Sequence, residues 1–130
     1  MKRCEIRSTR REEFIDITPL IRDELHRSGT RDGLCAVHCP HTTAGLTVNE
    51  HADPSVAEDI LAALDRLVLV EGPWTHLEGN SPAHVKASLV GSSVQLLVSN
   101  GDLALGTWQG VFLCEFDGPR AREVWLCFVP

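Results

Sequence analysis

The sequence lacks the positive charge that binding to nucleic acid requires. Its 130 residues include 12 lysines and arginines against 18 aspartates and glutamates, which gives a formal net charge of −6 and a pI of about 5.4. A protein that binds phosphate backbones carries a basic patch or stripe, and often a basic pI. We therefore expect no nucleic-acid partner.

The chain also has no long apolar run near its start. The positively charged segment MKRCEIRSTRREEF is not followed by an apolar stretch long enough for a signal peptide or a membrane helix. We therefore expect a cytoplasmic protein with no membrane partner.

The number and spacing of the cysteines do not match a disulfide framework or a zinc-binding motif. There are five of them, an odd number, and none forms a C-x-x-C pair, so neither a disulfide framework nor a zinc ribbon is expected. Four lie among apolar residues: Cys4, Cys35, Cys114 and Cys127. A reduced thiol behaves there as a small hydrophobe, while Cys39, beside His41, fits this interpretation least well.

The sequence contains no internal repeat, low-complexity tract or long linker. Apolar residues make up 43% and charged residues 23%, which is typical of a globular protein with a packed core. A chain of this length can bury a core without disulfides or a structural metal. We expect one domain that spans residues 1–130.

Three segments with proline next to a capping residue predict helices. They are TPLIRDELHRSG, DPSVAEDILAALDRLV and SPAHVKASLVG. The expected N-caps are Thr18, Asp53 and Ser81, each followed directly by proline, and Gly29 and Gly91 are the expected ends of the first and third helices. The second helix has the clearest apolar face.

Strand patterns fill most of the remaining chain. The expected strands are residues 3–8, 12–17, 33–39, 44–49, 93–99, 102–105, 109–116 and 122–129. Two turns predict hairpins: SNGD, which contains Asn100 and Gly101, and DGPR, which follows Phe116. Consecutive strands before and after the helices favour an α+β fold, a single compact domain of mostly antiparallel β-sheet layers with about three helices.

Three of the six histidines lie in segments typical of binding sites. His41 precedes Thr42 and Thr43 after a proline bend, so these three side chains can face a common pocket. His76 lies in a glycine-rich and proline-rich loop, and His84 falls at the third position of an expected helix, where the helix dipole disfavours protonation. Because neutral imidazoles bind metal, the three histidines fit an open metal site. The alternative for each is a structural histidine.

Nitrogen-only ligation indicates the kind of metal. Imidazole suits zinc, nickel or cobalt better than magnesium, which prefers oxygen ligands. We expect zinc, with magnesium as the alternative if it arrives with a diphosphate substrate.

Other polar residues are candidates for substrate binding or proton chemistry. Glu50 and Asn49 are the candidates for proton chemistry, and the alternative is that Glu50 only solvates a turn and that Asp53 only caps a helix. Lys86 and Arg120 are the candidate partners of an anionic ligand, unless Arg120 merely closes a hairpin and Lys86 lies on a solvated helix face. A further segment predicts a bulge or a close approach of the backbone to a ligand: Gly106, Thr107, Trp108 and Gln109.

Three motifs, in order over nearly the whole chain, resemble the YjbQ-like family, called secondary thiamine-phosphate synthases. The motifs are HTTAGLTVNEHADPSVAEDI, HLEGNSPAHVKASLVG and LALGTWQGVFLCEFDGPR. Packing alone is not expected to produce H-x-E-G-N, then A-H-x-K-A-S, then G-T-W-Q.

The resemblance implies a YjbQ-like fold, a homotrimer with sites near subunit boundaries, and a divalent metal held by His41, His76 and His84. The apolar runs VFLCEF and VWLCFV also favour subunit association. The implied activity joins a pyrimidine diphosphate to a thiazole phosphate and releases pyrophosphate. Two alternatives stay open, a non-catalytic protein that binds a metal or a phosphorylated metabolite, and a metal-assisted phosphoester hydrolase. We expect a phosphorylated small molecule as the substrate.

Overall fold

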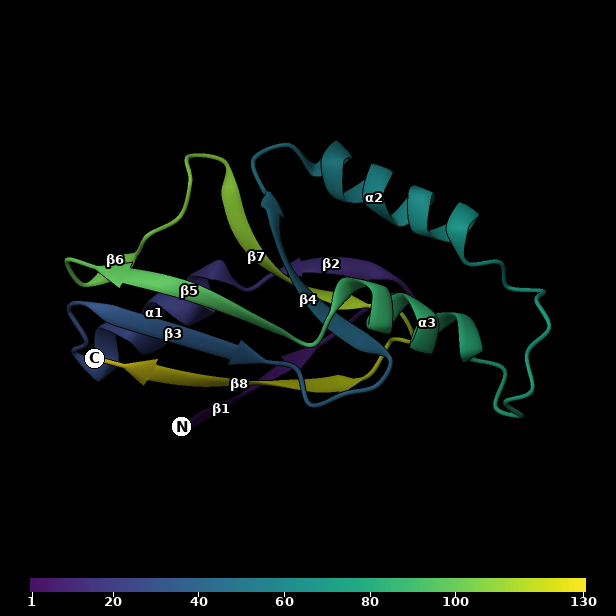
Figure 1. Cartoon of the computed structure of the whole chain (residues 1–130), viewed down its shortest axis with the longest axis horizontal. Coiled ribbons are helices and arrows are strands. Elements are labelled where there is room, and N and C mark those ends of the chain that lie inside the picture. Colours follow the sequence, from purple (N-terminus) through teal and green to yellow (C-terminus); the bar gives the residue numbers. More distant parts are fainter.

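A computed structural model describes all of residues 1–130, which form three α-helices and eight β-strands (Figure 1). In chain order the elements are β1 (Lys2–Arg7), β2 (Glu13–Asp16), α1 (Thr18–Ser28), β3 (Gly33–His38), β4 (Ala44–Glu50), α2 (Pro54–Leu67), α3 (Ser81–Val90), β5 (Ser93–Ser99), β6 (Asp102–Leu103), β7 (Gln109–Glu115) and β8 (Ala121–Val129). The three helices and eight strands expected from the sequence are all present, so those predictions are confirmed.

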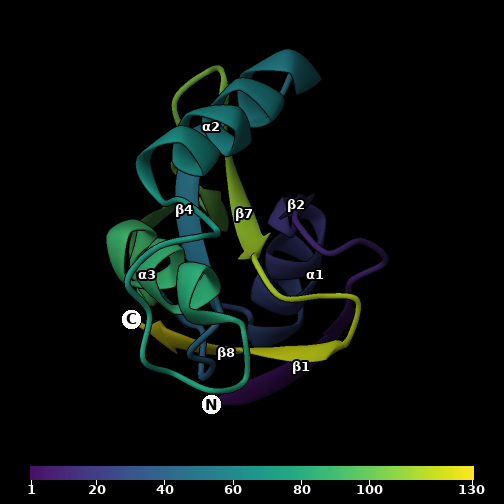
Figure 2. The same ribbon diagram turned by 90° about the vertical axis from the view of Figure 1, so that its right-hand side faces the viewer.

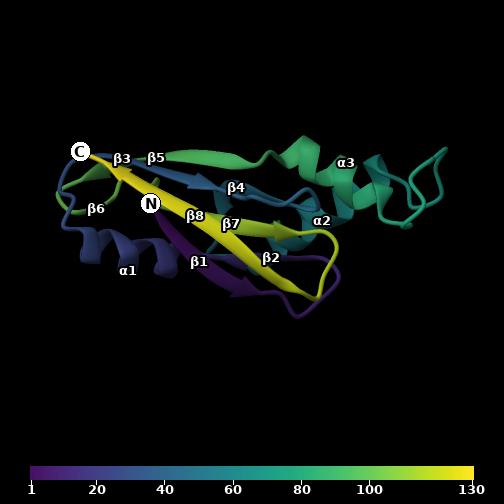
Figure 3. The same cartoon turned by 90° about the horizontal axis from the view of Figure 1, so that it is seen from below.

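The strands form two antiparallel sheets. One has five strands in the order β1-β8-β3-β5-β6, and the other has three in the order β2-β7-β4. Figure 2 shows β4 and β7 with α3 on one side and α1 on the other, and Figure 3 shows α1 and α3 near opposite ends of the strands. The predicted α+β fold with antiparallel sheet layers is therefore confirmed.

The main core lies between the two sheets and beneath α1. It combines residues of the five-stranded sheet, such as Val37 and Leu126, with Leu46 and Leu113 of the other sheet and Ile21 of α1. These five side chains are at most 1% exposed, so the two sheets and α1 share one continuous apolar interior.

A second, smaller core covers the opposite face of the three-stranded sheet. Phe112, Cys114 and Phe116 of the β7 segment pack there with Ala87 of α3 and Leu64 of α2. Strand β7 is thus buried on both faces, because alternate residues enter the two cores. The apolar run VFLCEF is accounted for within one chain, and it no longer argues for subunit association.

Two predicted helix caps are wrong by one residue. Thr18 is the first residue of α1 rather than its cap, and its hydroxyl accepts a hydrogen bond from the Val111 N–H at 2.8 Å. Ser81 is likewise the first residue of α3, and Asn80 precedes it without a side-chain capping bond. A tertiary hydrogen bond to β7 uses the Thr18 oxygen that a cap would need. The Asp53 cap is confirmed, because its carboxylate accepts from the Ser55 N–H.

One of the two predicted hairpins is present. Strands β5 and β6 pair across Asn100 and Gly101, which both have positive φ (53° and 77°) as such a turn requires. The DGPR hairpin is wrong, since β7 and β8 belong to different sheets. That segment instead carries the chain between the sheets, and its Gly118 N–H donates to the Arg11 carbonyl at 2.9 Å.

None of the three helices is both long and apolar enough to cross a membrane.

Candidate functional site

The predicted site residues of the first motif lie at the two ends of β4, the strand labelled in Figure 1. His41, Thr42 and Thr43 come directly before the strand, whereas Asn49 and Glu50 are its last two residues. The strand has seven residues, and at about 3.3 Å per residue it separates the two groups by roughly 20 Å. A single small pocket in one chain therefore cannot hold both groups.

His41 and His84 line one open cavity at the start of β4. Its volume is about 500 Å³, and the hydroxyls of Thr42, Ser88 and Ser92 also line it. No lysine, arginine or carboxylate is among the lining residues. This cavity can therefore bind a ligand through imidazole and hydroxyl groups, without a protein cation.

His84 also lines an adjacent cavity of about 320 Å³ that contains His76 and Trp74. The ring centroids of His76 and His84 are 5.2 Å apart, with the planes at 87° to each other. Two imidazoles bound at about 2.0–2.1 Å to one tetrahedral zinc ion have ring centres roughly 5 Å apart. The spacing of the His76 and His84 rings is therefore that of two imidazole ligands of one such ion.

His41 is held differently from the other two histidines. Its Nε2 accepts a hydrogen bond from the Glu123 N–H of β8 at 2.8 Å, so the neutral ring carries its proton on Nδ1. Burial, followed by the nearby Arg122 guanidinium, lowers the pKa of His41 below the usual histidine value. Both effects favour the neutral ring, whose lone pair is directed to the backbone.

The three predicted metal ligands do not converge within one chain. No group of three or more His, Cys, Asp or Glu side chains is placed to hold a metal ion. His84 is the fourth residue of α3, and its N–H donates to the Asn80 carbonyl at 3.3 Å rather than being free as expected. The chain presents the pair of His76 and His84, with His41 in the neighbouring cavity, and metal binding stays a prediction.

Thr43 is bound to a buried ion pair that joins the two sheets. The Arg122 Nη2 donates to the Thr43 hydroxyl at 2.8 Å, and the Arg122 Nε donates to Glu115 of β7 at 2.9 Å. The two charged side chains are 3% and 0% exposed. Desolvation by burial raises the pKa of Glu115, but hydrogen bonds from Arg122 and Ser8 outweigh it and hold the pKa below the usual value. Thr43 therefore serves the fold, and Thr42 lines the cavity.

The two predicted cationic partners of a substrate are engaged elsewhere. The Lys86 ammonium is buried and donates to both oxygens of Glu12 at 3.0 Å and to Asp65 of α2. Arg120 donates to the carbonyl and the carboxylate of Asp117, at 2.8 and 3.0 Å, within the DGPR segment. Neither residue lines the histidine cavities, and Lys86 does not lie on a solvated helix face.

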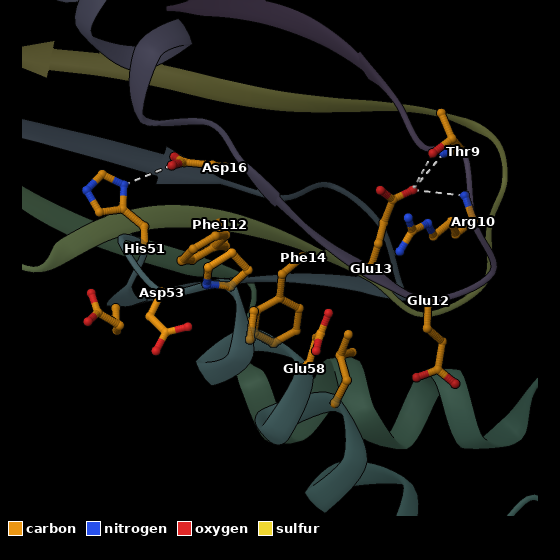
Figure 4. Close-up of a pocket in the computed structure, with 14 residues that line it drawn as sticks. Thr9, Arg10, Glu12, Glu13, Phe14, Asp16, His51, Asp53, Glu58 and Phe112 are labelled. Carbon is orange, nitrogen blue, oxygen red and sulfur yellow. Dashed lines mark hydrogen bonds and ion pairs between the residues drawn. The ribbon is translucent and has the colours of Figure 1, made fainter.

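At the far end of β4, Asn49 and Glu50 bind the local backbone. The Asn49 side chain accepts from the Glu50 N–H at 2.7 Å, and one Glu50 carboxylate oxygen accepts from the Ala52 N–H at 3.1 Å. Glu50 and His51 line a separate pocket beneath α2 (Figure 4). The two residues predicted for proton chemistry thus stabilise the turn into α2.

The Gly106 to Gln109 segment closes a tight turn beside the same end of β4. The Gln109 N–H and side-chain oxygen both bind Gly106, at 3.1 and 2.8 Å, while Trp108 is 63% exposed. A Cβ on Gly110 would lie 2.3 Å from the Nδ1 of His51. The group that approaches the backbone closely here is the His51 ring of the same chain, and an approach to a ligand stays a prediction.

The structure brings together two polar pairs that were not predicted from the sequence. His51 Nδ1 lies 2.8 Å from an Asp16 oxygen. Burial alone would raise the pKa of Asp16, but the hydrogen bonds from Thr18 and His51 hold it below the usual value. The other pair is Glu115 with Arg122, for which the signal was a carboxylate within the apolar run VFLCEF.

A sequence model of one protein family matches residues 2–130, and the family is described as "UPF0047 protein YjbQ-like". A UPF0047 protein of Methanocaldococcus jannaschii is 50% identical to this chain, over 94% of this chain and 88% of its own length. The UPF0047 protein YugU of Bacillus subtilis is 46% identical over 97% of this chain and 96% of its own length.

Solved structures give the same result. A protein of the YjbQ/UPF0047 family from Clostridium acetobutylicum superposes with a TM-score of 0.97 at 49% identity, covering 99% of this chain and 100% of that one. A conserved hypothetical protein from Thermus thermophilus superposes with a TM-score of 0.92 at 47% identity, again over 99% and 100% of the two chains.

Proposed function

The chain belongs to the UPF0047 YjbQ-like family, and from that membership we propose a metal-dependent transferase with thiamine-phosphate synthase-like activity. In this reaction the bond between the pyrimidine-bearing carbon and the diphosphate oxygen breaks. A bond from the same carbon to the thiazole nitrogen forms, and pyrophosphate leaves. The proposal rests on the resemblance of the three sequence motifs, and the geometry of His76 and His84 supports it.

The observation that carries the proposal is the position of His84 between two cavities. It shares one with His76 and the other with His41. His76 and His84 would hold the metal, and His41 is the third proposed ligand once its Nε2 releases the Glu123 N–H. The bound metal would neutralise charge on the diphosphate group.

The chain's own residues would bind and orient the phosphorylated substrate. The hydroxyls of Thr42, Ser88 and Ser92 can donate to phosphate oxygens in the cavity of His41 and His84. The Nδ1–H of His41 is a further donor, because a ring that binds the metal through Nε2 keeps its proton on Nδ1. Positioning by these donors would supply much of the catalysis, as is usual where charge leaves with a phosphate group.

We propose that a homotrimer completes the site. Within one chain the histidines lie at the opposite end of β4 from Glu50, Trp108 and Gln109, and Trp108 is 63% exposed. Leu97 on β5 is 61% exposed, which offers apolar surface for a subunit contact. Assembly would bring the histidine end of one subunit to the Trp108 end of the next.

One observation favours a second candidate, a binding protein without turnover. No carboxylate lines the cavity of His41 and His84, so a single chain offers only imidazoles for proton chemistry there. Such a protein would hold a metal or a phosphorylated metabolite and release it unchanged.

The test combines product formation with metal content. Purified protein, prepared without a histidine tag and reconstituted with zinc, is expected to form thiamine phosphate from the two precursors. His84→Ala should lose both activity and zinc, while His26→Ala, which alters an exposed histidine outside these cavities, should keep both. Product formation unaffected by His84→Ala would refute the proposed site, and zinc binding without product would favour the binding protein.

A second experiment tests whether the site spans two subunits. His84→Ala and Trp108→Ala are each expected to be inactive alone. When the two variants are mixed in equal amounts and reassembled into trimers, about a quarter of wild-type activity should return. One in four subunit contacts then joins the intact histidine end of a Trp108→Ala subunit to the intact tryptophan end of a His84→Ala subunit. No recovery from verified mixed trimers would show that both residues act within one chain.

A further inference from the structure

A separate cavity lies beneath helix α2, away from the three histidines (Figure 4). Its volume is about 350 Å³, within the range in which proteins bind small molecules. One wall is formed by Ala57, Glu58 and Leu61 of α2, and the opposite wall by Phe14 of β2 and Phe112 of β7. The cavity is therefore the space between α2 and the sheet that it covers.

The apolar part of this cavity is aromatic. The rings of Phe14 and Phe112 have centroids 5.8 Å apart and are tilted by 43°. Leu64, near the end of α2, is the one buried residue of that helix, so the first half of the helix stands off the sheet. Phe14 is therefore half-buried at the wall of the cavity, and Phe112 lies behind it at 6% exposed.

The polar part of the cavity is strongly acidic. Six carboxylates line it, together with one arginine and one histidine: Glu12, Glu13, Asp16, Glu50, Asp53, Glu58, Arg10 and His51. With the histidine neutral, the lining carries a formal charge of −5. This sign repels phosphorylated molecules, so the cavity cannot serve the anionic substrate proposed for the histidine end.

Several of these carboxylates already have partners within the protein, but others do not. Glu12 binds Lys86, and Glu13 accepts two backbone N–H groups. Glu58 makes no hydrogen bond or ion pair, and Asp53 uses only its Oδ1 oxygen, to cap α2. In Figure 4 the two phenyl rings lie between Asp53 and Glu58. Free carboxylate oxygens thus flank the aromatic wall of the cavity, where Phe14 is half-buried.

We infer that this cavity binds a small organic cation, a protonated amine attached to an aromatic or aliphatic body. The body would pack on Phe14 and Leu61, beside the edge of Phe112, and remove their remaining apolar surface from water. The ammonium group would lie near Glu58 and Asp53, where the carboxylates and the faces of the rings both attract a positive charge. Charge complementarity and the aromatic wall together select this class of ligand, and they do so independently of the proposed transferase activity.

The test uses phenethylamine and its uncharged analogue 2-phenylethanol with the full-length protein. In a titration followed by NMR of the labelled chain, the amine is expected to bind saturably, with shifts at Phe14 and Phe112. The alcohol should bind at least about tenfold more weakly, because it lacks the charge. Equal binding of both probes, or no saturable binding of the amine, would overturn the proposal.

Two neighbouring residues of α2 provide matched variants. Glu58→Gln should weaken amine binding about fivefold, since it removes a charge-assisted contact. Asp59→Asn removes the same charge from an exposed residue that does not line the cavity, and it should leave affinity within about 1.5-fold. Equal losses in the two variants would show general acidic attraction and no site. Thermal unfolding of both variants checks that each is folded.

Discussion

The buried pair of Arg122 and Glu115 leads to a sharp prediction for Arg122→Met. The variant keeps much of the side-chain volume but leaves the Glu115 carboxylate, which is 0% exposed, without its guanidinium partner. Removing one member of a buried ion pair costs about 3–5 kcal/mol, a large part of the roughly 5–15 kcal/mol that stabilises a typical domain. Ser8 and the Asp117 N–H remain as donors to Glu115, so we expect the lower part of that range.

The expected change in melting temperature follows from the chain length. Unfolding entropy is about 2.1 cal/mol/K per residue, which for 130 residues gives roughly 0.27 kcal/mol/K. A loss of about 3–5 kcal/mol then lowers Tm by roughly 11–18 °C. Urea unfolding followed by tryptophan fluorescence would measure the free energy directly. Arg120→Met is the matched control, because its ion pair with Asp117 is half-exposed and should contribute at most about 1 kcal/mol.

The pH dependence of the unfolding free energy is an independent test of the role of the Glu115 charge. The pKa of Glu115 is lower in the folded than in the unfolded wild type, so its stabilisation is present above the unfolded pKa and is lost as the pH falls through the folded one. Without Arg122, desolvation dominates and should raise the Glu115 pKa. Protonation then removes a buried charge, and the stability gap between wild type and variant should shrink from about pH 7.5 to about pH 5. A gap below about 1 kcal/mol at neutral pH, or one that widens on acidification, would refute this account.

Three further predictions concern packing, the second buried cation and the thiols. Gly45→Ala should destabilise the protein by about 1–3 kcal/mol, because its Cβ would lie 2.6 Å from the Gly91 carbonyl; urea unfolding measures this, and an unchanged midpoint would contradict it. Lys86→Met should cost only about 1–2 kcal/mol in the same assay, less than Arg122→Met, because Glu12 and Asp65 are 25% and 58% exposed and can be hydrated. Ellman's reagent should label one thiol of the native protein, since Cys127 is the one exposed cysteine and burial raises the pKa of Cys35 to about 12; more than one fast equivalent would contradict the fold.

The sequence by itself determined the secondary structure and the family. Proline beside a capping residue placed all three helices to within a residue or two, because these signals act over one turn of chain. The turn at Asn100 and Gly101 was equally local, since its positive φ values depend on the two residues themselves. Three motifs in order were enough to identify the family, which the relatives confirm.

Tertiary structure decided how the polar residues are used. The sequence grouped Thr43, Lys86 and Arg120 as substrate contacts. The partners of Thr43 and Lys86 lie 79 and 74 positions away in the chain, whereas Arg120 binds Asp117, three positions away. A hydroxyl or an ammonium group has the same appearance in a sequence whether it faces solvent, a ligand or a buried carboxylate. Only the packing of the two sheets shows that Thr43 binds Arg122 and that Lys86 is buried.

The sequence also does not show that the two ends of β4 serve different parts of the molecule. In the sequence, His41 and Glu50 are nine positions apart and belong to one motif. An extended strand turns that short separation into roughly 20 Å, so one motif supplies residues to two different places. Helix α2 then covers the far end and forms an acidic aromatic cavity, because two phenylalanines from different strands meet there only once the sheet has assembled.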